Sequence, residues 1–148
     1  MRNSNITSFT LIELLVVIAI TGVVAGVFVG TLRFLYPSWA LKGAVRELGT
    51  ELRLAQQSAV TEQINYGVRF STTTNQYQVL RYTSPVQVVS TKFLPQDISF
   101  YKIEGFINDE VLFNNYGGVQ AMGTSTLANT KGEKRVVQVR PSGFVKIK

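Results

Sequence analysis

The sequence has no cysteine and no histidine, and these two absences exclude several kinds of chemistry. Without cysteine there is no disulfide framework and no thiolate chemistry. Without histidine the chain lacks the commonest general base and the commonest protein ligand of zinc. The nine acidic residues are scattered, without the spacing of metal ligands. We therefore expect no metal site, no cofactor and no enzymatic activity, since a nucleophile–base pair and a phosphate-binding loop are also missing.

Acidic residues are outnumbered at the C-terminus, where most of the net charge of +6 is found. Residues 131–148 hold six basic side chains and one acidic side chain. Residues 34–130 hold equal numbers of each sign, so the body of the protein is neutral. A basic end on a neutral body indicates either an anionic partner or a solvated basic surface.

Charge is absent altogether from Leu14 to Leu32, a run of 19 residues. As a helix this run is about 28 Å long, close to the ~30 Å hydrocarbon core of a bilayer. It is longer than the ~7–15 apolar residues of a cleaved secretory signal. The alternative is a buried globular helix, but a chain of 148 residues can scarcely enclose a helix that is apolar on all sides. The run therefore predicts a membrane-spanning helix.

Beyond Pro37, which is expected to kink or restart the helix, the pattern predicts an amphipathic half. Its apolar residues recur at spacings of four and three until about Gln63, which places them on one stripe. The stripe consists of Leu41, Val45, Leu48, Leu52, Ala55 and Ala59.

From Asn65 onward, apolar residues alternate with polar ones in short runs, as in β-strands. The expected strands are 67–70, 77–82, 86–93, 98–103, 111–113, 125–128, 135–140 and 144–148. Because such strands must bury an apolar face, we expect them to pack on the stripe of the amphipathic helix.

A distinctive motif stands at the beginning of the apolar run. Residues 8–20 have the sequence Ser-Phe-Thr-Leu-Ile-Glu-Leu-Leu-Val-Val-Ile-Ala-Ile. They closely resemble the class III signal of type IV prepilins and type II secretion pseudopilins. In that family a membrane peptidase removes a short basic leader and methylates the new N-terminal amine. The resemblance implies cleavage between Ser8 and Phe9 and methylation of Phe9, although the family usually has glycine where Ser8 stands.

Two further segments look like the GspH/FimT group of minor pilins and pseudopilins: residues 52–60, which lead into a strand, and the closing hairpin 136–148. The resemblance implies an α+β fold, with a long N-terminal membrane-spanning helix packed through its C-terminal half on an antiparallel, two-sheet head. The expected parts are a leader (1–8), a transmembrane and filament-core helix (9–36), an amphipathic half (37–63) and a β-rich head (64–148).

The same resemblance implies location and partners. We expect a single-pass protein of the cytoplasmic (inner) membrane, with its N-terminus in the cytoplasm and its head outside, which enters a filament after assembly. Its expected partners are the prepilin peptidase and other pilins or pseudopilins.

Glu13 is a lone carboxylate at the start of the apolar segment. An ionised carboxylate deep in a bilayer costs about 2.5–3.5 kcal/mol, so Glu13 requires a partner. The Phe9 amine of a neighbouring subunit is one such partner. The alternative is local, because Thr10 and Glu13 have the spacing of a capping box at a helix start. The two roles are compatible.

Three glycines, Gly22, Gly26 and Gly30, recur every four residues and therefore share one face of the apolar helix. Small residues on one face allow helices to approach closely within a membrane. We expect this face to pack in the assembled filament. The alternative is that glycine is simply common in membrane helices.

The basic C-terminal residues are expected to form a hairpin around Pro141-Ser142-Gly143. Alternation then places Val137, Val139, Val145 and Ile147 on the inner face. The outer face collects Lys134, Arg140, Phe144, Lys146 and Lys148, which are candidates for binding the phosphates and bases of DNA. Some FimT-like minor pilins of competence systems bind DNA through a basic C-terminal region, so the resemblance favours the same partner. The alternative is a solvated face whose lysines prevent another strand from pairing with the exposed edge of the sheet.

Three functions stay open. The first is a minor pilin or pseudopilin subunit that helps to initiate or cap a type IV pilus or a type II secretion pseudopilus. The second is a DNA-binding minor pilin of a competence pilus. The third is a single-pass anchored protein that never polymerises.

Overall fold

The computed structural model describes residues 9–148, and it describes residues 29–33 by their backbone alone. The described chain contains one helix, α1 (Leu11–Glu62), and eight strands. The strands are β1 (Tyr66–Ser71), β2 (Gln76–Arg81), β3 (Gln87–Phe93), β4 (Ile98–Glu104), β5 (Glu110–Phe113), β6 (Gly123–Asn129), β7 (Lys134–Val139) and β8 (Val145–Ile147). All eight expected strands are confirmed to within a few residues at their ends.

The chain divides into two compact units, Met1–Tyr36 and Pro37–Lys148. In the first unit, Leu11–Phe28 has a mean hydropathy of 2.6 and is long and apolar enough to cross a membrane. The helix begins at Leu11 because the Thr10 hydroxyl oxygen accepts a hydrogen bond from the Glu13 backbone N–H at 3.3 Å. Within the apolar stretch, the Thr21 hydroxyl donates to the Val17 carbonyl at 2.7 Å, so this polar group is satisfied inside the helix.

Helix α1 passes through Pro37 without interruption, so of the two effects expected of Pro37, a kink or a restart, the restart does not occur. Proline removes one backbone donor, but packing of the following residues can maintain a helix despite that loss. The next residue, Ser38, donates its hydroxyl to the Glu133 carboxylate at 3.0 Å and ties this turn of α1 to the loop between β6 and β7.

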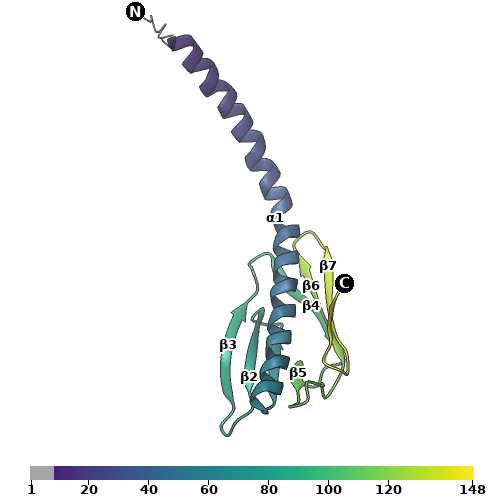
Figure 1. Ribbon diagram of the computed structural model, residues 1–148. Coiled ribbons are helices and arrows are strands. Elements are labelled where there is room, and N and C mark those ends of the chain that lie inside the picture. Colours follow the sequence, from purple (N-terminus) through teal and green to yellow (C-terminus); the bar gives the residue numbers. More distant parts are fainter. Residues whose placement is uncertain (1–8) are drawn as a thin grey trace, which may run out of the picture. The chain divides into compact units, whose positions relative to one another are not determined.

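The second unit, which we call the head, contains two antiparallel four-stranded sheets. Figure 1 shows β2 and β3 on one side of the C-terminal half of α1, and β4, β6 and β7 on the other. The strand orders are β3-β2-β1-β5 and β4-β6-β7-β8. The α+β class with a two-sheet head is therefore confirmed.

One core joins α1 to both sheets. All six residues of the predicted helical stripe are buried, each with 2% or less of its surface exposed. Every residue of this core lies between Leu41 and Val145. The head thus has a complete core without residues 1–36, and we expect it to fold as an independent unit.

The end of α1 is set by Gln63, whose backbone adopts a positive φ of 56°. Its side-chain amide donates to the Val60 carbonyl at 2.7 Å, satisfying one of the last carbonyls of the helix. The preceding residue, Glu62, forms an ion pair with Arg81 at 2.7 Å and accepts a hydrogen bond from Tyr66 at 2.8 Å. These contacts fasten the end of the helix to β1 and β2.

We expect Leu48→Ala to destabilise the head by about 2–5 kcal/mol, because Leu48 is 0% exposed and its removal leaves a cavity in the shared core. Leu54→Ala is the matched control, since Leu54 lies on the same helix and is 49% exposed. Urea unfolding of residues 37–148 measures both changes. Equal losses in the two variants would mean that the stripe does not hold the two sheets together.

Candidate functional site

The N-terminal motif forms the first turns of α1. Glu13 occupies the third helical position with an exposed side chain, and its backbone N–H is bonded to Thr10. This bond confirms one half of the predicted capping box. Within residues 9–148 the Glu13 carboxylate forms no ion pair, so a cation of another molecule can approach it. Phe9 is exposed, whereas Ser8 lies outside the described residues.

The glycine face of α1 is open in the isolated chain. A Cβ atom added at Gly22 or Gly26 would meet nothing within 4 Å, so another helix has room to approach at these two positions. Gly30 belongs to α1, but its surroundings lie outside the described side chains.

The predicted C-terminal hairpin is confirmed. The Arg140 N–H donates to the Phe144 carbonyl at 3.0 Å, and Gly143 turns the chain with a φ of 78°. Gln138 pairs with Lys146, and Val136 and Lys148 exchange backbone hydrogen bonds. The inner face carries Val137, Val139 and Val145, all buried, and the half-buried Ile147.

All five candidate DNA-binding side chains are exposed, but the structure divides them along the strand. Lys134 and Arg140 are six residues apart on and just after β7, about 20 Å at the rise of a strand. At the first end, the Lys134 ammonium lies 3.5 Å from the centre of the Tyr101 ring. At the other end, the Arg140 guanidinium carbon lies 5.9 Å from the centre of the Phe144 ring.

Tyr101 adds an exposed aromatic ring that the sequence analysis missed. It lies at a β-bulge between Phe100 and Lys102, and β6 separates its strand from β7. The nearby Lys134 ammonium lowers the pKa of the Tyr101 hydroxyl. No local pattern marks Tyr101, because its contact with Lys134 arises only when the three strands pair.

The two flanks of α1 carry opposite charges. On one flank, Lys42 and Arg46 line a pocket of about 230 Å³ together with Arg135 of β7, Val45 and Ile147. On the other flank, the carboxylates of Glu47 and Glu51 lie 3.5 and 4.0 Å from the Lys92 ammonium of β3.

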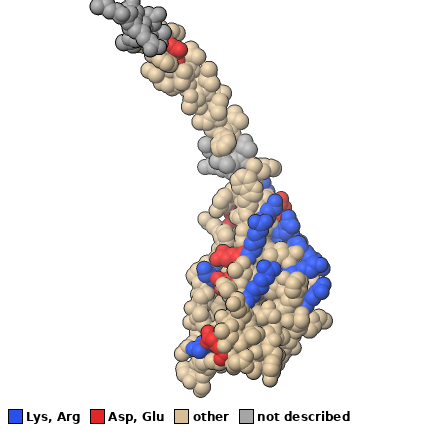
Figure 2. All heavy atoms as spheres, in the orientation of Figure 1, with Lys and Arg blue, Asp and Glu red and all other residues tan. Residues whose placement is uncertain are grey.

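Figure 2 shows Lys and Arg side chains gathered on one side of the head. The group formed by Lys42, Arg46 and Arg135 leaves no local pattern in the sequence, because Arg135 is far from the two helical residues along the chain.

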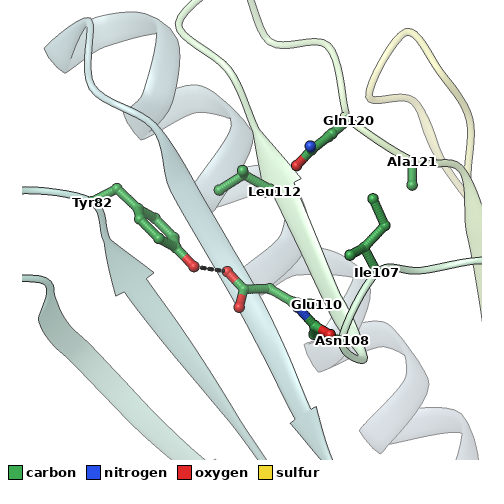
Figure 3. Close-up of a pocket in the computed structure, with 7 residues that line it drawn as sticks. All are labelled: Tyr82, Ile107, Asn108, Glu110, Leu112, Gln120 and Ala121. Atoms are coloured by element: carbon green, nitrogen blue, oxygen red, sulfur yellow. Dashed lines mark hydrogen bonds between the residues drawn. The ribbon is translucent and has the colours of Figure 1, made fainter.

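An ion pair between an exposed arginine and a buried glutamate, also missed, connects β1 and β5 of the first sheet. Glu110 of β5 is 9% exposed and lies opposite Arg69 of β1 in the strand register. The Arg69 guanidinium binds the Glu110 carboxylate through Nη2 at 2.9 Å and Nε at 3.0 Å. Figure 3 shows the Tyr82 hydroxyl donating to the other carboxylate oxygen. Burial raises the pKa of Tyr82, as does its hydrogen bond to Glu110.

The pocket beside this group has a volume of about 90 Å³ and is lined by Tyr82, Ile107, Asn108, Glu110, Leu112, Gln120 and Ala121. Both oxygens of its only carboxylate are bonded to Arg69 or Tyr82. A carboxylate held in this way stabilises the pairing of β1 with β5.

Comparison with known proteins adds two findings. Residues 3–29 match the family described as "Prokaryotic N-terminal methylation motif". Among curated proteins no relative matches the sequence.

Solved structures resemble the head. The minor pseudopilin EpsH from the type 2 secretion system of Vibrio cholerae superposes with a TM-score of 0.64 at 17% identity, covering 73% of this chain and 95% of EpsH. The type IV minor pilin FimU of Pseudomonas aeruginosa gives a TM-score of 0.59 at 15% identity, covering 73% of this chain and 92% of FimU. The chain therefore carries a prepilin-type methylation motif and has the fold of minor pilins and pseudopilins.

We expect Gly67→Ala to destabilise the head by about 1–3 kcal/mol, because a Cβ there would collide with the Glu110 carboxylate and force the ion pair apart. Gly43→Ala is the control. A Cβ at Gly43, inside α1, meets nothing within 4 Å, so alanine should stabilise the helix by about 0.5–1 kcal/mol. Thermal unfolding of residues 37–148 reports both changes. A neutral Gly67→Ala variant would show that the ion pair can move without cost.

Proposed function

We propose that this chain is a minor pilin or pseudopilin subunit, inserted in a membrane by the N-terminal part of α1 and then assembled into a filament. One observation carries the proposal: a methylation motif over residues 3–29 and a head with the minor pseudopilin fold occur in the same chain. The motif suits processing and assembly through the helix. The head, which has its own core, suits a position outside the filament core.

In this proposal, cleavage between Ser8 and Phe9 creates a new N-terminal amine on Phe9. Its positive charge survives methylation, so it can pair with a carboxylate. Glu13 stands at the third helical position with an exposed carboxylate and can therefore reach the Phe9 amine of a neighbouring subunit. Surrounded by apolar helices, an unpaired carboxylate is costly, so the pair favours one stagger of adjacent subunits.

The proposed assembly face of α1 also includes Gly22, Gly26 and Gly30. The open space at Gly22 and Gly26 supports close packing by a neighbouring helix. A bulky side chain at the middle position would hold the helices apart.

We expect the mature protein to begin at a methylated Phe9. Intact-mass and N-terminal peptide analysis of membrane-extracted protein, from cells that contain the prepilin peptidase, measures this directly. Ser8→Gly restores the residue usual in the family and should process at least as completely. A mature chain that retained Met1 or Arg2 would overturn the proposed processing.

We expect Glu13→Val to preserve membrane insertion and to reduce recovery of the subunit in sheared filaments. Insertion should be slightly easier, because a charge leaves the apolar segment. Assembly should suffer, because the neighbouring Phe9 amine loses its partner. Gly26→Leu tests the glycine face in the same preparation.

Full recovery of the Glu13→Val subunit would leave Glu13 with a capping role only. If the subunit without any substitution were absent from filaments, the alternative of a membrane-anchored protein that never polymerises would be favoured instead.

A second candidate function is DNA binding by the outer face of β7 and β8. The observation that favours it is the confirmed register, which aligns exposed cations with an aromatic ring at each end of the face. The face is about 20 Å long, and one strand of a DNA duplex presents a phosphate every ~3.4 Å. Cations would neutralise the phosphates, and Phe144 or Tyr101 could stack on a base.

For this candidate we expect residues 37–148 to bind DNA with an affinity that falls steeply as salt rises. Lys146→Ala together with Lys148→Ala removes two phosphate contacts and should lower the slope of log affinity against log salt by roughly 2. Fluorescence anisotropy at several salt concentrations provides the slope. If DNA binding were unchanged by these two substitutions, the outer face would be an ordinary solvated sheet surface and not a DNA-binding site.

A further inference from the structure

Trp39, Lys42 and Arg46 lie on one face of α1, within the part of the helix that belongs to the head. Spacings of three and four residues place them one above another along the helix. All three side chains are exposed, Trp39 by 55%. Arg135 lies beside them, since it lines the same 230 Å³ pocket as Lys42 and Arg46. We call these four residues the docking face.

The three cations of the docking face form no ion pair with any residue of the described chain, 9–148. The carboxylates of the head are largely engaged elsewhere. Five of the eight are paired with other cations: Glu47, Glu51, Glu62, Glu104 and Glu110. A second copy of this head therefore offers few free carboxylates to the docking face, and an anion from outside the chain suits it better.

Chain connectivity brings one source of such anions close. Trp39 follows Leu32, the end of the uncharged run, by only seven residues. Tryptophan next to Lys and Arg at the end of a membrane span is typical of residues at the lipid headgroups. Basic residues at this position are attracted to anionic phospholipids.

We propose that the docking face binds the phosphates of anionic phospholipid headgroups and holds the head against the membrane that its own helix spans. This proposal rests on the membrane insertion proposed above. The pocket is lined by the three cations together with the apolar side chains of Val45 and Ile147. Such a hollow fits separate headgroup phosphates better than the continuous backbone of a nucleic acid.

Long basic side chains suit this contact. Lys and Arg residues near the end of a membrane span extend their charged ends to the headgroups while their apolar stems stay on the protein. Lys42 follows Leu32 by ten residues, so it lies near the end of the uncharged run.

Trp39 is the only tryptophan in the chain and is a native reporter of this contact. The full chain is reconstituted in vesicles of phosphatidylcholine, with or without phosphatidylglycerol. We expect phosphatidylglycerol to reduce quenching of Trp39 by neutral acrylamide at least twofold and to increase quenching by brominated acyl chains. High salt should reverse both effects, because the contact is ionic.

Charge-matched variants identify the surface. Arg46→Gln with Arg135→Gln should abolish the response to phosphatidylglycerol. Arg140→Gln with Lys146→Gln removes the same charge from the rest of the hairpin and should leave the response intact. In a second experiment, residues 37–148 are sedimented with phosphatidylglycerol vesicles. Arg46→Gln with Arg135→Gln should weaken partition of the head onto the vesicles about 25-fold at low salt, and Arg140→Gln with Lys146→Gln should weaken it much less.

Alkaline extraction of the reconstituted full chain separates this inference from the proposed function. If the chain is extracted, the membrane anchor has failed, and sedimentation of the head still tests the docking face. Quenching and sedimentation that were indifferent to phosphatidylglycerol, or equal in the two variant pairs, would overturn the docking proposal. Binding of DNA through Arg46 and Arg135, without binding to anionic vesicles, would also overturn the docking proposal.

Discussion

The fold of the head depends on one apolar stripe, formed by six residues of α1 between Leu41 and Ala59. Two separate four-stranded sheets must each bury one face, and the stripe contributes to a single core with both of them. The stripe also sustains the helix beyond Pro37, where a backbone donor is missing.

The same burial arranges the charges. Once the stripe faces the core, the residues beside it point to one sheet or the other. Lys42 and Arg46 lie near β7 and β8, whereas Glu47 and Glu51 lie near Lys92 of β3. On the acidic flank Glu47 and Glu51 share one cation, Lys92, whereas Lys42, Arg46 and Arg135 form no ion pair with the described residues. The basic C-terminal hairpin extends this charged side, so the asymmetry of the head follows from where the helix packs.

Much of this organisation was predictable from local sequence. Apolar periodicity identified the stripe and all eight strands, because burial of one face imposes a period of about 3.6 in helices and of two in strands. The register of the C-terminal hairpin could be predicted from the length of its turn. A three-residue turn at 141–143 makes Arg140 pair with Phe144, and this pairing sets all the others. The helix does not restart at Pro37, which was one of the two effects expected there, because proline acts locally whereas the packing that maintains α1 comes from the head.

By itself the sequence determined the uncharged span, the processing motif, the helical stripe and the inner face of the hairpin. Each of these depends on neighbours within a few turns of helix or along a single strand pair. Only the tertiary structure decided the contacts between distant segments. Arg69 meets Glu110 because β1 pairs with β5, and Arg135 joins Lys42 and Arg46 because β7 packs near α1. Such contacts depend on how two sheets share one helix, and no local periodicity encodes that arrangement.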